Sequence, residues 1–272
     1  MSFLKIMNKI TIIGSGNIGL SLANGLVKSG QYIPQNITLT RRNIQSLVSE
    51  IEQGFVASDD NAEAILGADI IVLAILPQQI KSVMDQLKGL IKANQLIVSV
   101  VSGVTCTQIK EVLGEEAVVV RAMPNTAIAI GESMTCICTD TAASEAVQRV
   151  EKLFETVGAV VVINEDLMTS ATALCACGIA FFLRSIRAAS QGGVEIGFHA
   201  HDALKMAVQT AKGAADLLLL TQNHPESEID KVTSPKGCTI AGLNEMEHNG
   251  FSSAFIKGIK LSALKAGGLY NE

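Results

Sequence analysis

Three glycines near the start of the chain have the spacing of a loop that binds a dinucleotide. Gly14, Gly16 and Gly19 form a Gly-x-Gly-x-x-Gly pattern between an apolar stretch, 9–13, and an amphipathic one, 17–28. The first glycine allows a tight turn, the second lets a pyrophosphate approach the backbone, and the third packs the helix on the strand. The helix N-terminus then offers free N–H groups to the anion. We therefore predict a dinucleotide site that comprises Gly14, Ser15, Gly16, Asn17, Ile18 and Gly19. A merely structural glycine turn is the alternative.

Two arginines at the end of the next apolar stretch indicate which dinucleotide is bound. Arg41 and Arg42 follow the expected strand 37–40, and no acidic residue occurs between Lys28 and Arg42. An NAD site usually places a carboxylate there to hold the ribose hydroxyl, whereas arginine suits a 2′-phosphate. The sequence thus predicts NADPH, with NADH as the second choice. A solvated arginine pair at a helix start is the plainer interpretation.

A second loop that could bind an anion runs from Ser234 to Thr239, directly before the helical stretch 239–248. Its backbone N–H groups form a plausible cradle for a carboxylate. Thr239 is either a functional hydroxyl or a helix N-cap. The four histidines, His199, His201, His224 and His248, are candidate acid–base groups, but none lies in a partner motif, and we interpret His224 as part of a loop.

The six cysteines include two Cys-x-Cys pairs, Cys136 with Cys138 and Cys175 with Cys177. The first pair lies in an alternating, strand-like stretch. The second lies in a helical stretch, where positions two apart point in different directions. Zinc would need four converging ligands. We therefore expect small buried apolar residues, reduced thiols and no metal.

These residues must be positioned by elements that alternate between strand and helix in the first part of the chain. Strands are expected at 9–13, 37–40, 69–75, 96–101, 117–121 and 159–163. Their continuous Val, Ile and Leu content is typical of a parallel sheet covered on both faces. Long helices follow at 165–189, 201–222, 239–248 and 252–266, with a loop at 223–238 that holds two prolines. The predicted fold is α/β: an N-terminal Rossmann dinucleotide-binding domain, 1–163, and an all-α C-terminal domain, 164–272.

Composition narrows the functions that fit this fold. The 272 residues carry a formal net charge of −5, and aromatic residues make up only 4%. A nucleic-acid binder would normally show a basic face or stacking aromatics, so no nucleic-acid partner is expected. Neither a signal peptide nor an uninterrupted apolar run of membrane-spanning length is apparent, which predicts a cytoplasmic protein without a membrane partner.

Several motifs along the chain occur in an order that indicates a family. They are Ala74-Ile75-Leu76-Pro77-Gln78, Ser99 to Thr105, Arg121-Ala122-Met123-Pro124-Asn125-Thr126, Gln209-Thr210-x-x-Gly213-Ala214-Ala215, His224-Pro225, and Asp230 to Leu243. The chain resembles the pyrroline-5-carboxylate reductases over essentially its whole length. The last of these motifs is the most specific.

This resemblance implies a function and a set of site residues. It implies reduction of the cyclic imine carboxylate by NAD(P)H to L-proline, the last step of proline biosynthesis. It also implies a homodimer through the C-terminal domain, with a decamer of five dimers as a further assembly. The cofactor would contact Ala74, Leu76, Pro77, Met123 and Pro124 besides the glycine loop and the arginines. The substrate would contact Asn125, Ser234, Pro235, Lys236, Gly237, Cys238 and Thr239, with Thr239 as the catalytic residue that bonds to the ring nitrogen.

The chain departs from the family pattern at several of these places. Ala127 replaces the last proline of R-x-M-P-N-T-P, Lys236 replaces a glycine, and Leu76 replaces a lysine. Ala176-Cys177-Gly178-Ile179-Ala180 replaces G-S-G-P-A. If the glycine at 236 needs a positive φ, lysine there costs about 1 kcal/mol. Two alternatives therefore stay open: a reductase of a related cyclic imine or ketimino acid, and a nucleotide-sensing paralogue without catalysis.

Overall fold

The computed structural model describes residues 8–140 and 144–268, and the chain divides into two compact units. The first unit comprises 1–177 with 261–272, and the second comprises 178–260. The predicted domain boundary after residue 163 stays a prediction, because a compact unit and a sequence domain need not end at the same residue. Each unit is described by itself below.

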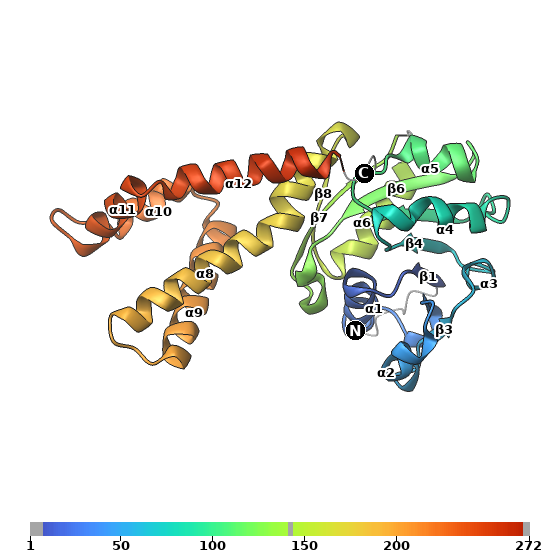
Figure 1. The fold of residues 1–272 in the computed structure, drawn as a ribbon, viewed down its shortest axis with the longest axis horizontal. Helices are drawn as coiled ribbons and strands as arrows, with labels where there is room; N and C mark the ends of the chain where they lie inside the picture. The colour runs from blue at the N-terminus through green and yellow to red at the C-terminus, as the bar shows by residue number, and fades with distance from the viewer. Residues whose placement is uncertain (1–7, 141–143, 269–272) are drawn as a thin grey trace. The chain divides into compact units, whose positions relative to one another are not determined.

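The first unit is built on one eight-stranded sheet, which Figure 1 shows. The strand order is β3-β2-β1-β4-β5-β6-β7-β8. The strands are β1 (Ile10–Ile13), β2 (Ile37–Thr40), β3 (Val56–Ser58), β4 (Ile70–Leu73), β5 (Leu96–Ser99), β6 (Val118–Met123), β7 (Ser133–Cys138) and β8 (Gly158–Val162). The predicted α/β class with a dinucleotide-binding topology is confirmed. Strand order reverses at β1, the position at which such sheets bind ligands.

One strand runs against the predicted parallel direction. β7 pairs antiparallel with β6, while every other neighbouring pair is parallel. The connection from Met123 to Ser133 holds only the 3-10 turn η4 (Thr126–Ile130) and Gly131 at φ +77°. A parallel crossover needs about a dozen residues or more, usually with a helix, so this short connection returns antiparallel.

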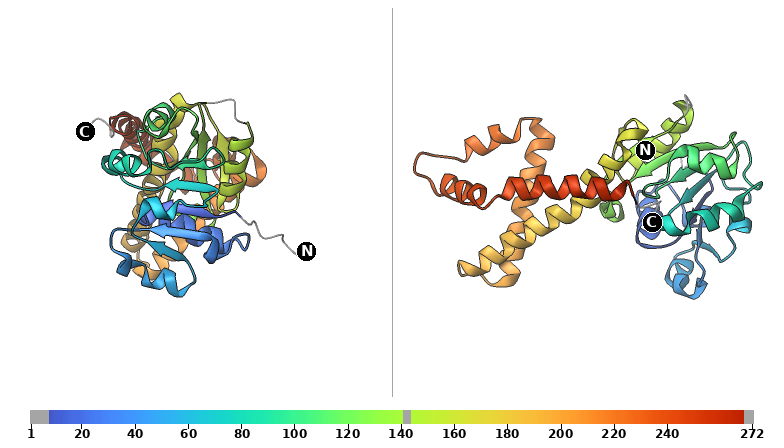
Figure 2. Two further views of the ribbon diagram at one scale, coloured as in Figure 1. Left: turned by 90° about the vertical axis from the view of Figure 1, so that its right-hand side faces the viewer. Right: turned by 45° about the horizontal axis from the view of Figure 1, so that its top comes forward.

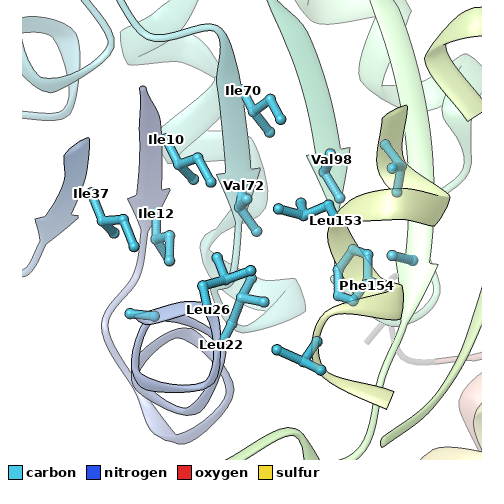
Figure 3. Packing of buried hydrophobic residues seen from close by; sticks show 14 of the residues in the cluster. Ile10, Ile12, Leu22, Leu26, Ile37, Ile70, Val72, Val98, Leu153 and Phe154 are labelled. Atoms are coloured by element: carbon cyan, nitrogen blue, oxygen red, sulfur yellow. The ribbon is translucent and has the colours of Figure 1, made fainter. Parts of the chain in front are cut away.

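Helices cover both faces of the sheet, as the views in Figure 2 show. They are α1 (Asn17–Lys28), α2 (Val48–Glu52), α3 (Asn61–Ala64), α4 (Ile80–Leu87), α5 (Cys106–Leu113) and α6 (Ser144–Glu155), with 3-10 turns η1 (Pro34–Asn36), η2 (Ile44–Leu47) and η3 (Pro77–Gln79). On one face, α1 and α6 bury Leu22, Leu26 and Phe154 against the strands (Figure 3). On the other face, α4 and α5 bury a second apolar cluster that includes Ile80 and Ile109. The sheet therefore lies between two hydrophobic cores, both formed by residues of the first unit.

The chain leaves the sheet through a short series of turns. These are η5 (Glu165–Leu167), α7 (Met168–Ala171) and the π-helical turn η6 (Thr172–Cys177), where a single helix was predicted. Two ion pairs, each with a buried cation and a half-buried carboxylate, lie at this end of the sheet. Arg121 Nη1 donates to Glu165 Oε1 at 2.9 Å, and Lys110 Nζ donates to Asp140 Oδ1 at 2.7 Å.

The second unit is entirely helical. It holds α8 (Gly178–Glu195), α9 (Ala200–Thr221), α10 (Pro225–Lys231), α11 (Cys238–His248) and most of α12 (Phe251–Ala266). α8 and α9 form a hairpin in which Gly193 approaches Ala203 closely. Phe255 of α12 contacts Phe181 and Phe182 of α8, with ring centroids 6.0 and 5.5 Å apart. The predicted loop 223–238 contains the unpredicted helix α10, which begins at a proline.

Few side chains are buried inside the second unit, all of whose residues the structure describes. Only Gly178 and Ala203 are buried there, while large apolar side chains stay exposed on every long helix. Examples are Phe182, Leu219, Leu220, Met246 and Ile256. The continuous segment Glu165–Glu195 is also long and apolar enough, by length and composition, to cross a membrane, with a mean hydropathy of 1.6. Charged Arg184 and Arg187 lie within this segment, so it contains no uninterrupted apolar run of membrane-spanning length.

Candidate functional site

The glycine loop joins β1 to α1 and has the geometry that its three positions predict. Gly14 has φ +94°, and a Cβ there would lie 2.5 Å from the carbonyl oxygen of Ala74. A Cβ on Gly19 would lie 2.2 Å from the carbonyl oxygen of Gly14. Nothing lies within 4 Å of the corresponding point on Gly16. The first and third glycines are therefore required by the fold, whereas the second faces open space that a ligand can approach.

Gly16 is also the N-cap of α1. As a glycine it has no side chain to cap the helix, and no acidic residue lies in the first turn. The N–H groups of this turn therefore point toward the open space without a competing carboxylate. A pyrophosphate fits such a helix end, because the N–H groups and the helix dipole both favour negative charge.

A cleft of about 690 Å³ opens over this loop at the carboxyl ends of β1, β2 and β4. Predicted cofactor residues in its wall are Gly14, Ser15, Gly16, Asn17, Ile18, Arg41, Arg42, Ala74 and Leu76. Gly19, Pro77, Met123 and Pro124 do not line it. Gly19 lies behind the loop, where it packs the helix. The remaining lining residues are Ile13, Thr40, Asn43, Asp59, Asn61, Ile75, Gln79, Val83 and Val100.

The two arginines lie at one end of the cleft and are exposed. Arg41 Nη1 donates to the carbonyl oxygen of Ser15 at 3.1 Å, which holds the guanidinium beside the glycine loop. Neither guanidinium is in an ion pair with an acidic group of the described residues. Both charges are thus available to an anion, as the 2′-phosphate of NADPH requires.

A chain of side-chain hydrogen bonds that the sequence did not predict includes two residues of the cleft wall, Thr40 and Asn61. Thr40 Oγ1 donates to Asn61 Oδ1 at 2.7 Å, and Asn61 Nδ2 donates to Gln86 Oε1 at 2.9 Å. Asn61 begins α3, which Asp60 caps by accepting from the N–H groups of Ala62 and Glu63. That capping pattern, Asp60 three residues before Glu63, was the available sequence signal.

The segment that follows β6 is held from several sides. Asn125 is buried; its Oδ1 accepts from the N–H of Ala127 at 3.0 Å, and its Nδ2 donates to the carbonyl oxygen of Cys175 at 3.3 Å. Its own N–H donates to Ser133 Oγ at 3.1 Å. Asn125 therefore ties the turn after β6 to β7 and to η6. Its expected contact with substrate stays a prediction.

The loop before α11, in the second unit, has the backbone conformation on which the expectation for Lys236 depended. Lys236 has φ +60°, so a lysine occupies a left-handed position that favours glycine. Gly237 is the N-cap of α11, and its N–H donates to the carbonyl oxygen of Ser234 at 2.9 Å. A Cβ on Gly237 would lie 2.5 Å from Ser234 Oγ, which explains the glycine. Residue 236 therefore has the positive φ at which a lysine costs about 1 kcal/mol relative to glycine.

Thr239 is the second residue of α11, not its N-cap. The interpretation of Thr239 as a capping residue is therefore wrong, because Gly237 already holds that position. Within the described part of the chain its hydroxyl has no hydrogen-bond partner. A half-buried hydroxyl without a protein partner beside a helix N-terminus can bond to a bound ligand.

His224 has the structural role that the sequence analysis gave it. Its Nδ1 accepts from the N–H of Glu226 at 3.3 Å, so it caps α10, and Pro225 takes the first helical position. Proline suits this position because its missing N–H would have no intrahelical partner.

Comparison with known proteins gives matches over nearly the whole chain. Residues 165–269 match the family model for pyrroline-5-carboxylate reductase dimerisation, and residues 9–103 match that for NADP oxidoreductase, coenzyme F420-dependent. Pyrroline-5-carboxylate reductase 2 of Dictyostelium discoideum is 47% identical, covering 97% of this chain and 93% of the relative. Pyrroline-5-carboxylate reductase 1 of the same organism is 46% identical, and this chain spans 50% of its length. Among solved structures, Plasmodium falciparum pyrroline carboxylate reductase with NADP bound matches at a TM-score of 0.89 and 25% identity, covering 97% of this chain and 98% of that one.

Proposed function

Because this chain belongs to the pyrroline-5-carboxylate reductase family, we propose that it reduces 1-pyrroline-5-carboxylate to L-proline with NADPH, the last step of proline biosynthesis. The observation that carries the proposal is the cleft over the glycine loop. Its residues fit a dinucleotide, because a Cβ at Gly16 would meet open space and the loop is flanked by two arginines that form no ion pair with the described residues. The family assignment agrees with the resemblance carried by the sequence motifs.

In the first unit, the residues proposed to hold the cofactor act through shape and charge. The N-terminus of α1 binds the pyrophosphate, and Arg41 and Arg42 bind the 2′-phosphate, which selects NADPH over NADH. Ala74 and Leu76 border the cleft from the loop after β4, and the turn at Met123 and Pro124 lies at the carboxyl end of β6. When bound, NADPH supplies the hydride that is added to the imine carbon.

In the second unit, the loop 234–239 is proposed to bind the substrate. Its backbone N–H groups and the N-terminus of α11 hold the substrate carboxylate. Lys236 adds a positive charge to the same loop. The unpartnered Thr239 hydroxyl then bonds to the ring nitrogen and passes it a proton from water, since the reduced nitrogen must gain a proton. Asn125 positions the turn after β6 through its bonds to Ala127 and Cys175.

The assembly that we propose is a homodimer, with five dimers forming a decamer. A second copy would cover the exposed apolar side chains of α8, α9 and α12, which have few partners within the second unit. The exposed apolar side chains of α8 lie within segment 165–195, so a protein partner that covers them accounts for the apolar character of α8 without a membrane. We further propose a cytoplasmic location and no nucleic-acid partner, consistent with the net charge of −5.

The test is NADPH oxidation by the purified protein with pyrroline-5-carboxylate and, separately, with its six-membered homologue. We expect turnover of the five-membered imine to exceed that of the homologue. Preferred turnover of the homologue would favour the related-imine alternative. Tight NADPH binding without turnover of either would favour the sensing alternative.

The proposed role of Thr239 is tested by a matched pair of variants. Thr239→Ala removes the hydroxyl and should lower kcat by about 10²-fold, with NADPH affinity unchanged. Thr239→Ser keeps a hydroxyl and should retain most of the turnover. An unchanged kcat in Thr239→Ala would overturn the role.

A further inference from the structure

Two cysteines from different elements of the first unit face each other. The Sγ of Cys136, on β7, lies 3.7 Å from the Sγ of Cys175, in the π-helical turn η6. Cys136 is only 6% exposed, whereas Cys175 is half-buried. A disulfide S–S bond is about 2.05 Å long, so a shift of less than about 2 Å would bring the sulfurs to bonding distance.

The two thiols differ in acidity in the way that a redox pair requires. The hydrogen bond from Cys136 lowers the pKa of Cys175 to about 7, against the opposing effect of burial. The same hydrogen bond, together with burial, raises the pKa of Cys136. The lowered pKa favours the thiolate, the nucleophilic form, at the half-buried Cys175, whereas Cys136 stays a thiol.

The pair is connected to the turn that follows β6. Cys136 is the strand partner of Met123, and both lie in one apolar cluster with Met168 and Ala171. The carbonyl oxygen of Cys175 accepts from Asn125 Nδ2. A displacement of Cys175 toward β7 would therefore move the carbonyl oxygen that accepts the Asn125 hydrogen bond.

We propose that Cys136 and Cys175 form a peroxide-oxidisable dithiol that becomes a disulfide. The Cys175 thiolate attacks one oxygen of hydrogen peroxide, giving a sulfenic acid and hydroxide. The Cys136 thiol then attacks that sulfur, the S–S bond forms, and the sulfenic oxygen leaves as water. Overall, two thiols lose two hydrogens, and the peroxide is reduced to two waters.

We expect the disulfide also to slow catalysis, and this expectation rests on the proposed function. Drawing Cys175 toward β7 shifts its carbonyl oxygen relative to Asn125, so the turn after β6 loses one of its supports. Small displacements of positioning groups can lower turnover by as much as about 10²-fold. Oxidation is expected to lower kcat about tenfold, and reduction by dithiothreitol is expected to restore it.

The chain offers two internal comparisons for the test. Cys106 and Cys138 are a second pair of interacting thiols, but Cys106 Sγ donates to the carbonyl oxygen of Val119 at 3.9 Å, and both cysteines are fully buried and should be protected from peroxide. Cys177 lies two residues after Cys175 in the same turn and is also half-buried. It makes no sulfur contact in the described part of the chain, so Cys177→Ser is the matched control.

The experiment treats the reduced full-length protein with hydrogen peroxide, alkylates the remaining thiols and maps peptides by mass spectrometry. Wild type and Cys177→Ser should yield a peptide that links Cys136 to Cys175 and disappears on reduction. Cys175→Ser should yield none, and Cys136→Ser should accumulate a sulfenic acid at Cys175 that dimedone traps. Turnover is measured for wild type and for Cys175→Ser, so that any loss caused by oxidation of the exposed Cys238 occurs in both and can be subtracted.

The first result that would overturn the dithiol is the absence of the linked peptide at peroxide doses that oxidise Cys238 in wild type. A link between Cys106 and Cys138 in its place would do the same. Neither readout needs reductase activity, so failure of the proposed function is distinguishable. A linked peptide with unchanged turnover would overturn only the effect on catalysis.

Discussion

The two units of this molecule differ in how much of their apolar surface they bury within the same chain. The sheet of the first unit lies between two cores that helices of the same chain complete. The second unit has long helices with exposed leucines, and only Gly178 and Ala203 are buried. Buried apolar surface stabilises a fold by roughly 25 cal/mol per Å². The first unit therefore completes its hydrophobic cores by itself, whereas we propose that the second unit buries its apolar surface against another copy.

The two loops that we propose bind the ligands show the same contrast on a smaller scale. Both lead into a helix N-terminus. In the first unit, Gly14 and Gly19 are fixed by backbone atoms that leave no room for a side chain. In the second unit, Lys236 keeps a left-handed conformation in an exposed loop. Such a substitution is tolerable where solvent surrounds the side chain, because only the local backbone cost must be met.

The largest effect is expected from charges placed on the second unit. Leu219 and Leu220 of α9 are 76% and 84% exposed. Leu219→Glu with Leu220→Glu should convert the proposed dimer to monomer and lower turnover more than about 10²-fold, because charges oppose apolar association. NADPH binding by the first unit should stay within about threefold of wild type. Analytical ultracentrifugation and fluorescence titration measure the two quantities.

The matched control is Leu66→Glu, which places the same charge at a leucine of the first unit that is 63% exposed. It should leave the molecular mass and turnover unchanged. A double variant that stays dimeric would mean that these leucines lie outside the interface.

The next largest effect should separate two glycines of one loop. Gly14→Ala should lower the free energy of unfolding by about 3 kcal/mol, because alanine disfavours φ +94° and its Cβ would collide with Ala74. Gly16→Ala should change it by less than about 0.5 kcal/mol, yet weaken NADPH binding at least about tenfold. Urea unfolding and NADPH titration test both. Equal destabilisation by the two variants would contradict the assignment.

A third prediction concerns cofactor selection at the end of the cleft. Arg41→Ala with Arg42→Ala should raise the Kd of NADPH about 100-fold and that of NADH by less than about threefold, since only NADPH carries the 2′-phosphate. Lys81→Ala with Lys88→Ala removes two exposed cations from the α4 region and controls for net charge. Calorimetric titration of each cofactor gives the ratio. A parallel loss of both cofactors would show that the arginines do not select.

The smallest effect is expected at Lys236. Lys236→Gly should raise the free energy of unfolding by up to about 1 kcal/mol, because glycine adopts φ +60° without strain. Lys236→Ala removes the charge but keeps the strain, so it should give no such gain. If the charge helps to bind the substrate carboxylate, KM should rise equally in both variants. Thermal unfolding and steady-state kinetics separate the two contributions.

Much of the first unit follows from local sequence. The bounds of α1, 17–28, and of β2, 37–40, match their predictions, because periodicity and the flanking glycines are local signals. β3 has only three residues, which are too few for an apolar pattern to predict a strand. α10 was missed because Pro225 looked like a helix breaker, although it lies at the favoured first position.

The sequence by itself determined the glycine loop, the basic end of the cleft and the family, because these depend on residue type and spacing along the chain. Only the tertiary structure decided that Asn61 bonds to Thr40, that Asn125 bonds to Cys175, and that Cys136 meets Cys175. Each of these pairs joins side chains from separate elements. Their distance depends on strand register, turn geometry and packing, and no local pattern in the sequence encodes those quantities.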